Sequence, residues 1–216
     1  MVQPILSDAF EIIDISPTLC PKTATYPMDT PFSRKIDLSF ERGDNLLLSS
    51  INTSLHVGAH ADAPNHYHSK GAGIDARSLH YYIGPVQVIH TPTQNGRRLT
   101  PQDIAKKDVR APRVLFRTDS FPDPMRWQDE FSSLSPELID TLHAKKVCLI
   151  GIDTPSVDPS ASKHLESHQK IFACDMAILE NLVLSHVPEG IYTLVALPLK
   201  IGDADASPVR AILLKN

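Results

Sequence analysis

One short segment of this 216-residue chain concentrates side chains that could bind a metal ion and move protons. It contains His56, His60, Asp62 and His66, separated by small residues and a proline. The small neighbours leave room for an ion or a substrate to approach. Two imidazoles and a carboxylate are a common ligand set for zinc and similar divalent ions. The pattern therefore predicts a metal site with one further group that can take or give a proton.

The other interpretation of this segment is an exposed, histidine-rich loop, because the chain contains ten histidines. Clustering with an aspartate favours the metal site. Pro64 disfavours a helical conformation at the preceding residue, so we expect a loop that leaves a strand. The continuous metal-binding helix of the zinc proteases is excluded on the same ground. Surface or structural roles are expected for His68, His80, His90, His143 and His186.

Glu180 is a second candidate, because it lies inside the apolar run from Ala177 to Leu184. An unpaired carboxylate is expensive to bury, so Glu180 needs a cationic partner. The residues alone leave two partners open, which are a lysine or arginine from elsewhere in the chain and a metal ion. His168 lies twelve residues before Glu180 and carries a further potential ligand.

The elements that must position these residues are predicted to be mostly strands. Apolar and β-branched runs between turn residues indicate strands at Phe10–Ile15, Leu46–His56, Pro85–His90, Val114–Thr118, Val147–Ile152, Tyr192–Pro198 and Val209–Leu214. A capping hydroxyl followed by proline predicts helix starts at Thr100 and at Ser135, the latter helix running to about Lys146. A buried helix is expected from Asp175 to Leu184. This mixture predicts an α/β or α+β sheet covered by a few helices.

Composition narrows the class of protein further. The length and the absence of a linker or repeat predict one domain over residues 1–216. A net charge of −4 argues against nucleic acid as a partner. No apolar run is long enough for a membrane helix, and the N-terminus lacks the pattern of a secretory signal. Together with three scattered cysteines, these features predict a cytoplasmic protein with no membrane partner.

Several motifs resemble those of one family. They are His56-x-Gly-Ala-His60-x-Asp62-Ala-Pro64-x-His66, Ser167-His168 and Ile-Leu-Glu180, together with Asp14-Ile-Ser-Pro17, Tyr26-Pro27-x-Asp29-Thr-Pro31-Phe, Gly151-Ile-Asp-Thr-Pro-Ser-Val-Asp158 and Ala204-Asp-Ala-Ser-Pro-Val-Arg210. This set is similar to the bacterial kynurenine formamidase (arylformamidase) branch of the cyclase family, and it spans essentially the whole chain. One motif departs from the family pattern, because Tyr26-Pro-Met28-Asp stands where the family usually has Trp-Pro-Gly-Asp.

The resemblance implies a swivelling β/β/α domain, an α/β fold with a mixed sheet and a few covering helices, in a homodimer. It implies two zinc ions per subunit, one held by His56, His60 and Asp62 and the other by Asp62, His168 and Glu180. Asp62 and Glu180 would bridge the ions, which decides the partner of Glu180 in favour of metal. His66 would be the general acid/base, and Tyr26 would contact the substrate.

The activity implied by the resemblance is hydrolysis of N-formyl-L-kynurenine to L-kynurenine and formate, a step of tryptophan degradation. One alternative keeps the fold and opens a cyclic amide such as isatin, with one manganese ion in place of two zinc ions. Another is a catalytically idle metal- or ligand-binding module, which His66 disfavours because a binding site needs no spare proton carrier. Ser156 is not favoured as a nucleophile, because no GxSxG turn surrounds it.

Overall fold

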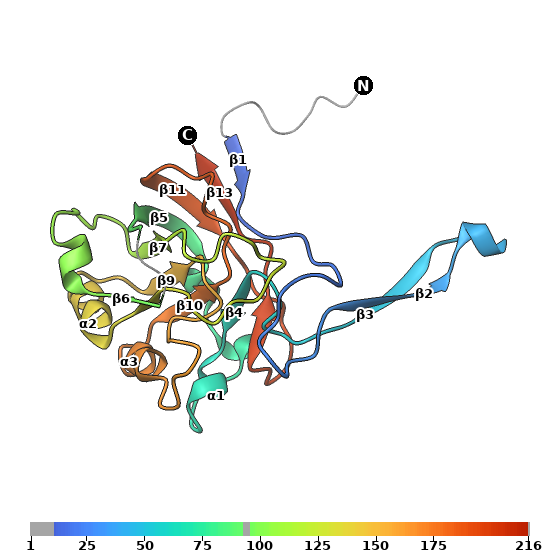
Figure 1. The fold of residues 1–216 in the computed structure, drawn as a ribbon, viewed down its shortest axis with the longest axis horizontal. Coiled ribbons are helices and arrows are strands. Elements are labelled where there is room, and N and C mark those ends of the chain that lie inside the picture. Colours follow the sequence, from blue (N-terminus) through green and yellow to red (C-terminus); the bar gives the residue numbers. More distant parts are fainter. Residues whose placement is uncertain (1–10, 93–95, 216) are drawn as a thin grey trace.

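A nine-stranded mixed sheet organises the computed structural model, which describes residues 11–92 and 96–215. The sheet is strongly curled (Figure 1). Its strand order is β1 (Glu11–Asp14), β13 (Ile212–Lys215), β11 (Gly190–Val195), β5 (Ile83–His90), β7 (Arg113–Arg117), β9 (Leu149–Ile152), β10 (Ala177–Glu180), β4 (His60–Asp62) and β12 (Ala206–Pro208). The central strands β5, β7, β9 and β10 run parallel, and the outer pairs are antiparallel.

The two faces of the sheet carry separate apolar cores, because successive residues of a strand point to opposite faces. Leu115, Leu149 and Leu179 belong to the core inside the curl of the sheet. Phe116, Ile150 and Ile178 belong to the other core, where side chains from two helices cover the sheet. These helices are α2 (Pro136–Ala144) and α3 (Glu166–Ala173), and they lie on the same side of the sheet in Figure 1.

Most of the predicted elements are present, so the mixed α/β class is confirmed. Each of the seven predicted strands overlaps a strand of the structure, although Phe10 lies outside the described residues. The helix predicted from Ser135 is α2, and the Ser135 hydroxyl accepts a hydrogen bond from the Leu138 backbone N–H. At Thr100 the chain forms only a 3₁₀ turn, Pro101–Ile104, closed by a capping box between Thr100 and Asp103.

The buried helix predicted from Asp175 to Leu184 is wrong. This run contains strand β10 (Ala177–Glu180), which pairs with β9 on one side and with β4 on the other. A short run that is apolar on all sides fits a central strand as well as a buried helix, and only the sheet decides between them. The helix of this region is α3, which ends just before Asp175 and was not predicted.

The segment from His56 to His66 also contains more regular structure than the predicted loop. His60–Asp62 form strand β4, and α1 (Pro64–Tyr67) follows directly. Ala63 between them is extended, with φ −96° and ψ 150°, as expected for a residue before proline. Other short elements are the parallel pair β6 (Arg98–Leu99) and β8 (Ser133–Leu134) and the 3₁₀ turns Phe40–Arg42, Ile74–Ala76 and Leu79–Tyr81.

A two-stranded arm extends away from the sheet (Figure 1). It is built from β2 (Ser33–Leu38) and β3 (Leu48–Asn52), which pair antiparallel. Large apolar side chains stand exposed along it, and these are Ile36, Phe40, Leu46, Leu47, Leu48 and Ile51. Among the residues that the structure describes, no helix is long and apolar enough to cross a membrane.

Candidate metal and active site

Two neighbouring strands place three of the predicted ligands on one face of the sheet. His60 and Asp62 are two residues apart in β4, so their side chains point the same way. Glu180 of β10 lies directly opposite His60 in the antiparallel register. All three side chains are buried, with 1% to 4% of their surface exposed. The strand pairing therefore assembles a buried cluster of two carboxylates and an imidazole.

A fourth predicted ligand reaches this cluster from the helix that covers the same face. The Nε2 atom of His168 in α3 lies 3.3 Å from Asp62 Oδ2 and 3.6 Å from Glu180 Oε1. The Nε2 atom of His60 lies 3.4 Å from Asp62 Oδ1 and 3.3 Å from Glu180 Oε2. Each carboxylate thus presents one oxygen to His60 and the other to His168. Two carboxylates placed in this way can bridge a pair of adjacent ions.

The other ring nitrogen of each histidine has a separate hydrogen-bond partner. The Nδ1 atom of His60 donates to the Gly58 carbonyl at 2.8 Å, and Gly58 has a positive φ of 58°. The Nδ1 atom of His168 lies 2.8 Å from Asp158 Oδ2. Because an oxygen acceptor takes the proton on Nδ1, Nε2 is the ring nitrogen that faces the cluster in both residues. Once Nε2 loses its proton, its lone pair is available to a metal ion.

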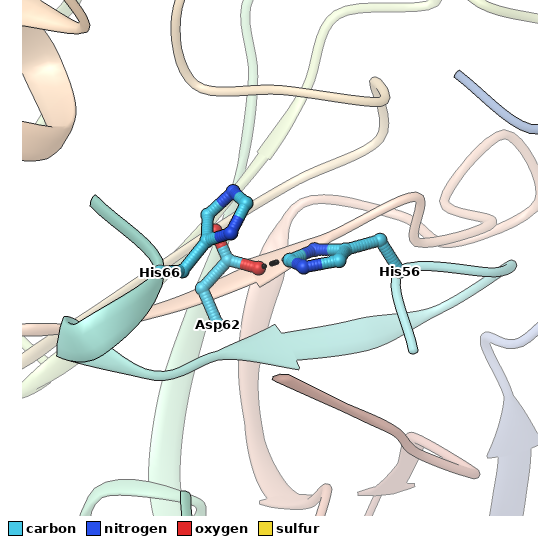
Figure 2. A group of neighbouring side chains, drawn as sticks. All are labelled: His56, Asp62 and His66. Atoms are coloured by element: carbon cyan, nitrogen blue, oxygen red, sulfur yellow. Dashed lines mark ion pairs between the residues drawn. The ribbon is translucent and has the colours of Figure 1, made fainter. Parts of the chain in front are cut away.

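His56 and His66 flank β4 in the sequence and converge on Asp62 (Figure 2). The Nδ1 atom of His56 lies 3.1 Å from Asp62 Oδ1, and its Nε2 atom lies 3.0 Å from Asp205 Oδ2. Among the described residues, two groups could hold an ion, namely His56, Asp62 and His66, and His60, Asp62 and Glu180. These groups divide the ligands differently from the predicted sets, but Asp62 is shared between the sites in both divisions.

The charges of the cluster shift the pKa values of its members strongly. Burial acts to lower the pKa of His60, but the Asp62 and Glu180 carboxylates outweigh it and raise that pKa to about 10. The pKa of His168 is likewise raised to about 10, against burial, by Asp158, Asp62 and Glu180. Burial lowers the pKa of His66, whose side chain remains 36% exposed. The carboxylates thus favour the protonated, positively charged form of His60 and His168 when no cation is bound between them.

The donor set fits divalent metal ions. His60 Nε2 and Asp62 Oδ1 are buried and have no hydrogen-bond partner within the described part of the chain. Buried polar atoms are rarely left without a partner, so this pair of atoms indicates a site for a bound cation. Imidazole and carboxylate are the donors that zinc takes in hydrolytic sites. The cluster can therefore hold metal between His60, Asp62, Glu180 and His168, with His56 beside it.

A cavity of about 370 Å³ opens beside this cluster. Its lining includes His56, His60, His66, His168, Glu180 and Asp205. The lining also includes Tyr26 and Trp127, whose ring centroids are 4.6 Å apart. Ser156 also lines the cavity, but its hydroxyl accepts a hydrogen bond from the Asp158 backbone N–H, and no basic side chain of the described residues is hydrogen-bonded to it. The cavity joins an aromatic wall to the candidate metal site.

Three residues of the site were not predicted. Trp127 is the only tryptophan of the chain and carries no motif, so nothing in the sequence places it beside Tyr26. Asp158 and Asp205 stand in recognised motifs, but the sequence gives them no role. Their function as partners of His168 and His56 depends on contacts across 10 and 149 residues.

Comparison with known proteins relates the chain to one family. Residues 13–159 match the family model described as putative cyclase. A kynurenine formamidase of Polaromonas naphthalenivorans (strain CJ2) is 47% identical over 203 residues, which cover 94% of this chain and 90% of the relative. A kynurenine formamidase of Bordetella pertussis is 44% identical, covering 93% of this chain and 96% of the relative.

Solved structures share the fold over nearly the full length. A potential metal-dependent hydrolase with cyclase activity superposes with a TM-score of 0.83 at 27% identity, covering 96% of this chain and 99% of that one. Isatin hydrolase A of Labrenzia aggregata gives a TM-score of 0.81 at 26% identity, covering 95% of this chain and 94% of the other. Metal-dependent hydrolases are therefore among the proteins with this architecture.

Proposed function

Because this chain belongs to the cyclase family, we propose that it is a kynurenine formamidase, which hydrolyses N-formyl-L-kynurenine to L-kynurenine and formate. Relatives of that name at 44% and 47% identity, matching more than nine-tenths of the chain, support the assignment. The observation that carries it is the buried cluster of His60, Asp62, Glu180 and His168 beside a cavity that Tyr26 and Trp127 also line. A formyl group at the cluster and an aryl ring against the wall would fill this cavity.

Two zinc ions are the proposed cofactors, one at His56, His60 and Asp62 and the other at Asp62, His168 and Glu180. When bound, zinc supplies Lewis acidity that activates water and stabilises negative charge on a carbonyl oxygen. Asp62 and Glu180 support a paired site, because each directs one oxygen toward His60 and one toward His168. Hydrogen bonds at Nδ1 of His60 and His168 aim the Nε2 atoms of both rings at this point, where zinc would bind their deprotonated form.

His66 is the proposed general acid/base. Its ring lines the cavity and lies next to His56, with ring centroids 4.1 Å apart. A ring nitrogen of His66 would take a proton from the attacking water and return it to the aryl amine as the C–N bond breaks. An aryl amine is a better leaving group than an alkyl amine, so this reaction demands less of the site than peptide hydrolysis does.

Tyr26 and Trp127 are proposed to hold the aryl ring of the substrate. Replacing Trp127 with alanine should raise KM about tenfold, equivalent to about 1.4 kcal/mol of lost binding, while kcat falls much less. Trp127→Phe retains a ring and should remain within about threefold of wild type. Steady-state formate release measures both constants. A fall in kcat with KM unchanged would contradict a binding role.

The exposed arm supports a proposed homodimer. A two-stranded ribbon is marginally stable alone, and exposed apolar side chains on this scale mark an interaction surface. The side chain of Ile51 is 63% exposed on the arm, and that of Ile12 is 54% exposed on β1. Ile51→Asp should shift the protein toward monomer in light scattering, whereas Ile12→Asp should not. An unchanged mass for both variants would exclude the arm as the interface.

A cytoplasmic location is proposed as well. The three cysteines, Cys20, Cys148 and Cys174, are all free thiols. Unpaired thiols are typical of proteins in reducing compartments.

The decisive functional test compares two amides. Purified protein loaded with zinc should release formate from N-formyl-L-kynurenine with a kcat/KM far above that for opening isatin. Turnover of isatin alone would favour the second activity of this fold, which the isatin hydrolase structures represent. No turnover of either amide by protein that binds zinc would indicate a binding module without catalysis.

A further inference from the structure

The loop that ends at Asp158 has no part in the proposed chemistry so far, yet the Asp158 side chain is completely buried beside His168. One oxygen, Oδ2, lies 2.8 Å from the ring Nδ1 of His168 and 3.0 Å from the backbone N of the same residue. The Ser167 backbone N–H also donates to this carboxylate, at 3.1 Å. Asp158 therefore holds both the ring and the backbone of His168 and satisfies N–H groups in the first turn of α3.

The carboxylate is itself fixed on its far side. The Arg98 guanidinium lies 3.1 Å from Asp158 Oδ1 and 2.7 Å from Glu166 Oε2. Held by Arg98 on one side and by backbone N–H groups of α3 on the other, Asp158 is an immobile acceptor for the Nδ1 proton of His168.

The three histidines of the proposed site have unequal partners. His60 donates Nδ1 to a neutral backbone carbonyl, that of Gly58. His56 faces Asp205, whose side chain is 49% exposed and therefore screened by water. Of the three, only His168 has a buried carboxylate as the partner of the ring nitrogen that points away from the cluster. A carboxylate acceptor makes the opposite ring nitrogen more basic and fixes its direction, and loss of such a partner typically costs 10- to 100-fold in metal affinity.

We propose that Asp158 is a positioning residue that sets the zinc affinity of the position formed by His168, and leaves the position at His56 and His60 unaffected. This inference rests on the proposed two-zinc site. Within the described residues, Asp158 contacts no other candidate ligand, which is why its effect should be confined to one ion. The two ions would then respond separately to a change at Asp158.

Zinc binding to metal-free protein, measured by competition with a chromophoric chelator, tests the proposal. Wild type should bind two ions. In Asp158→Asn, one dissociation constant should rise about 10- to 100-fold and the other should stay within about twofold. In a His168→Ala background, which retains one position, adding Asp158→Asn should change nothing. If Asp158→Asn does not fold, Asp158→Glu, which displaces the carboxylate from Nδ1, should give the same selective loss.

Asp153→Asn is the matched control. Asp153 is a buried carboxylate of the same loop, but it accepts hydrogen bonds from Thr118 and from the Asp119 backbone. Its replacement should lower the thermal stability and leave both zinc constants unchanged. Unchanged constants in Asp158→Asn, equal changes in both constants, or an effect that persists without His168 would overturn the proposal. Failure of wild type to bind zinc would instead refute the proposed function.

Discussion

Asp62→Asn should reduce the hydrolysis of N-formyl-L-kynurenine at least about a thousandfold. The asparagine has nearly the same shape but no negative charge, and it cannot bridge two cations as a carboxylate does. A metal centre contributes several kcal/mol to catalysis, and each 1.36 kcal/mol is a factor of ten in rate. Asp62 is the residue common to both proposed sites, and three histidine nitrogens lie within 3.4 Å of its oxygens.

The same variant should also bind fewer zinc ions than wild type, and excess zinc should not restore its rate. Asp175→Asn provides a control, because Asp175 is an exposed aspartate that pairs with Arg77 outside the cavity. That variant should keep its zinc content and its activity within about twofold of wild type. An Asp62→Asn protein that retains two zinc ions and nearly full activity would refute the shared-ligand role.

His66→Ala should lower kcat by about 10² to 10⁴, which is the usual contribution of a general acid/base. Its zinc content should remain that of wild type, because the proposed ligands are all retained. Formate release and metal analysis on one protein preparation separate these effects. The fall in kcat should be larger for substrates with poorer leaving groups, because their hydrolysis depends more on protonation of the departing nitrogen.

His68→Ala is the control for His66, two residues away in the same segment. Its ring stacks on Phe172 at 3.8 Å and does not line the cavity. Activity of His68→Ala should be close to that of wild type. If His66→Ala loses zinc together with activity, His66 is a ligand, as the alternative grouping of His56, Asp62 and His66 allows.

Most strands could be predicted, because β-branched runs bounded by turn residues are typical of strands. The secondary structure of the run from Ala177 to Leu184 could not be predicted, because its apolar character fits a helix and a central strand equally. Pairing with β4 and β9 decides for the strand, and only that pairing brings Glu180 opposite His60. The organisation as one domain remains a prediction.

The site was predictable where its residues are close in the sequence. His56, His60, Asp62 and His66 fall within one segment, so their chemistry is visible from spacing alone. Glu180 was visible as a carboxylate in an apolar run, and His168 became meaningful only through the family resemblance. Contacts that form only when separate segments pack give Asp158, Asp205 and Trp127 their place in the site. No local sequence pattern predicts such contacts.

Stepwise addition of zinc to metal-free wild-type protein, with formate release measured at each step, tests the two-metal formamidase most directly. We expect no formate without zinc and full activity once two ions are bound per chain. Full activity in zinc-free protein, or no formate release with two ions bound, would contradict the assignment.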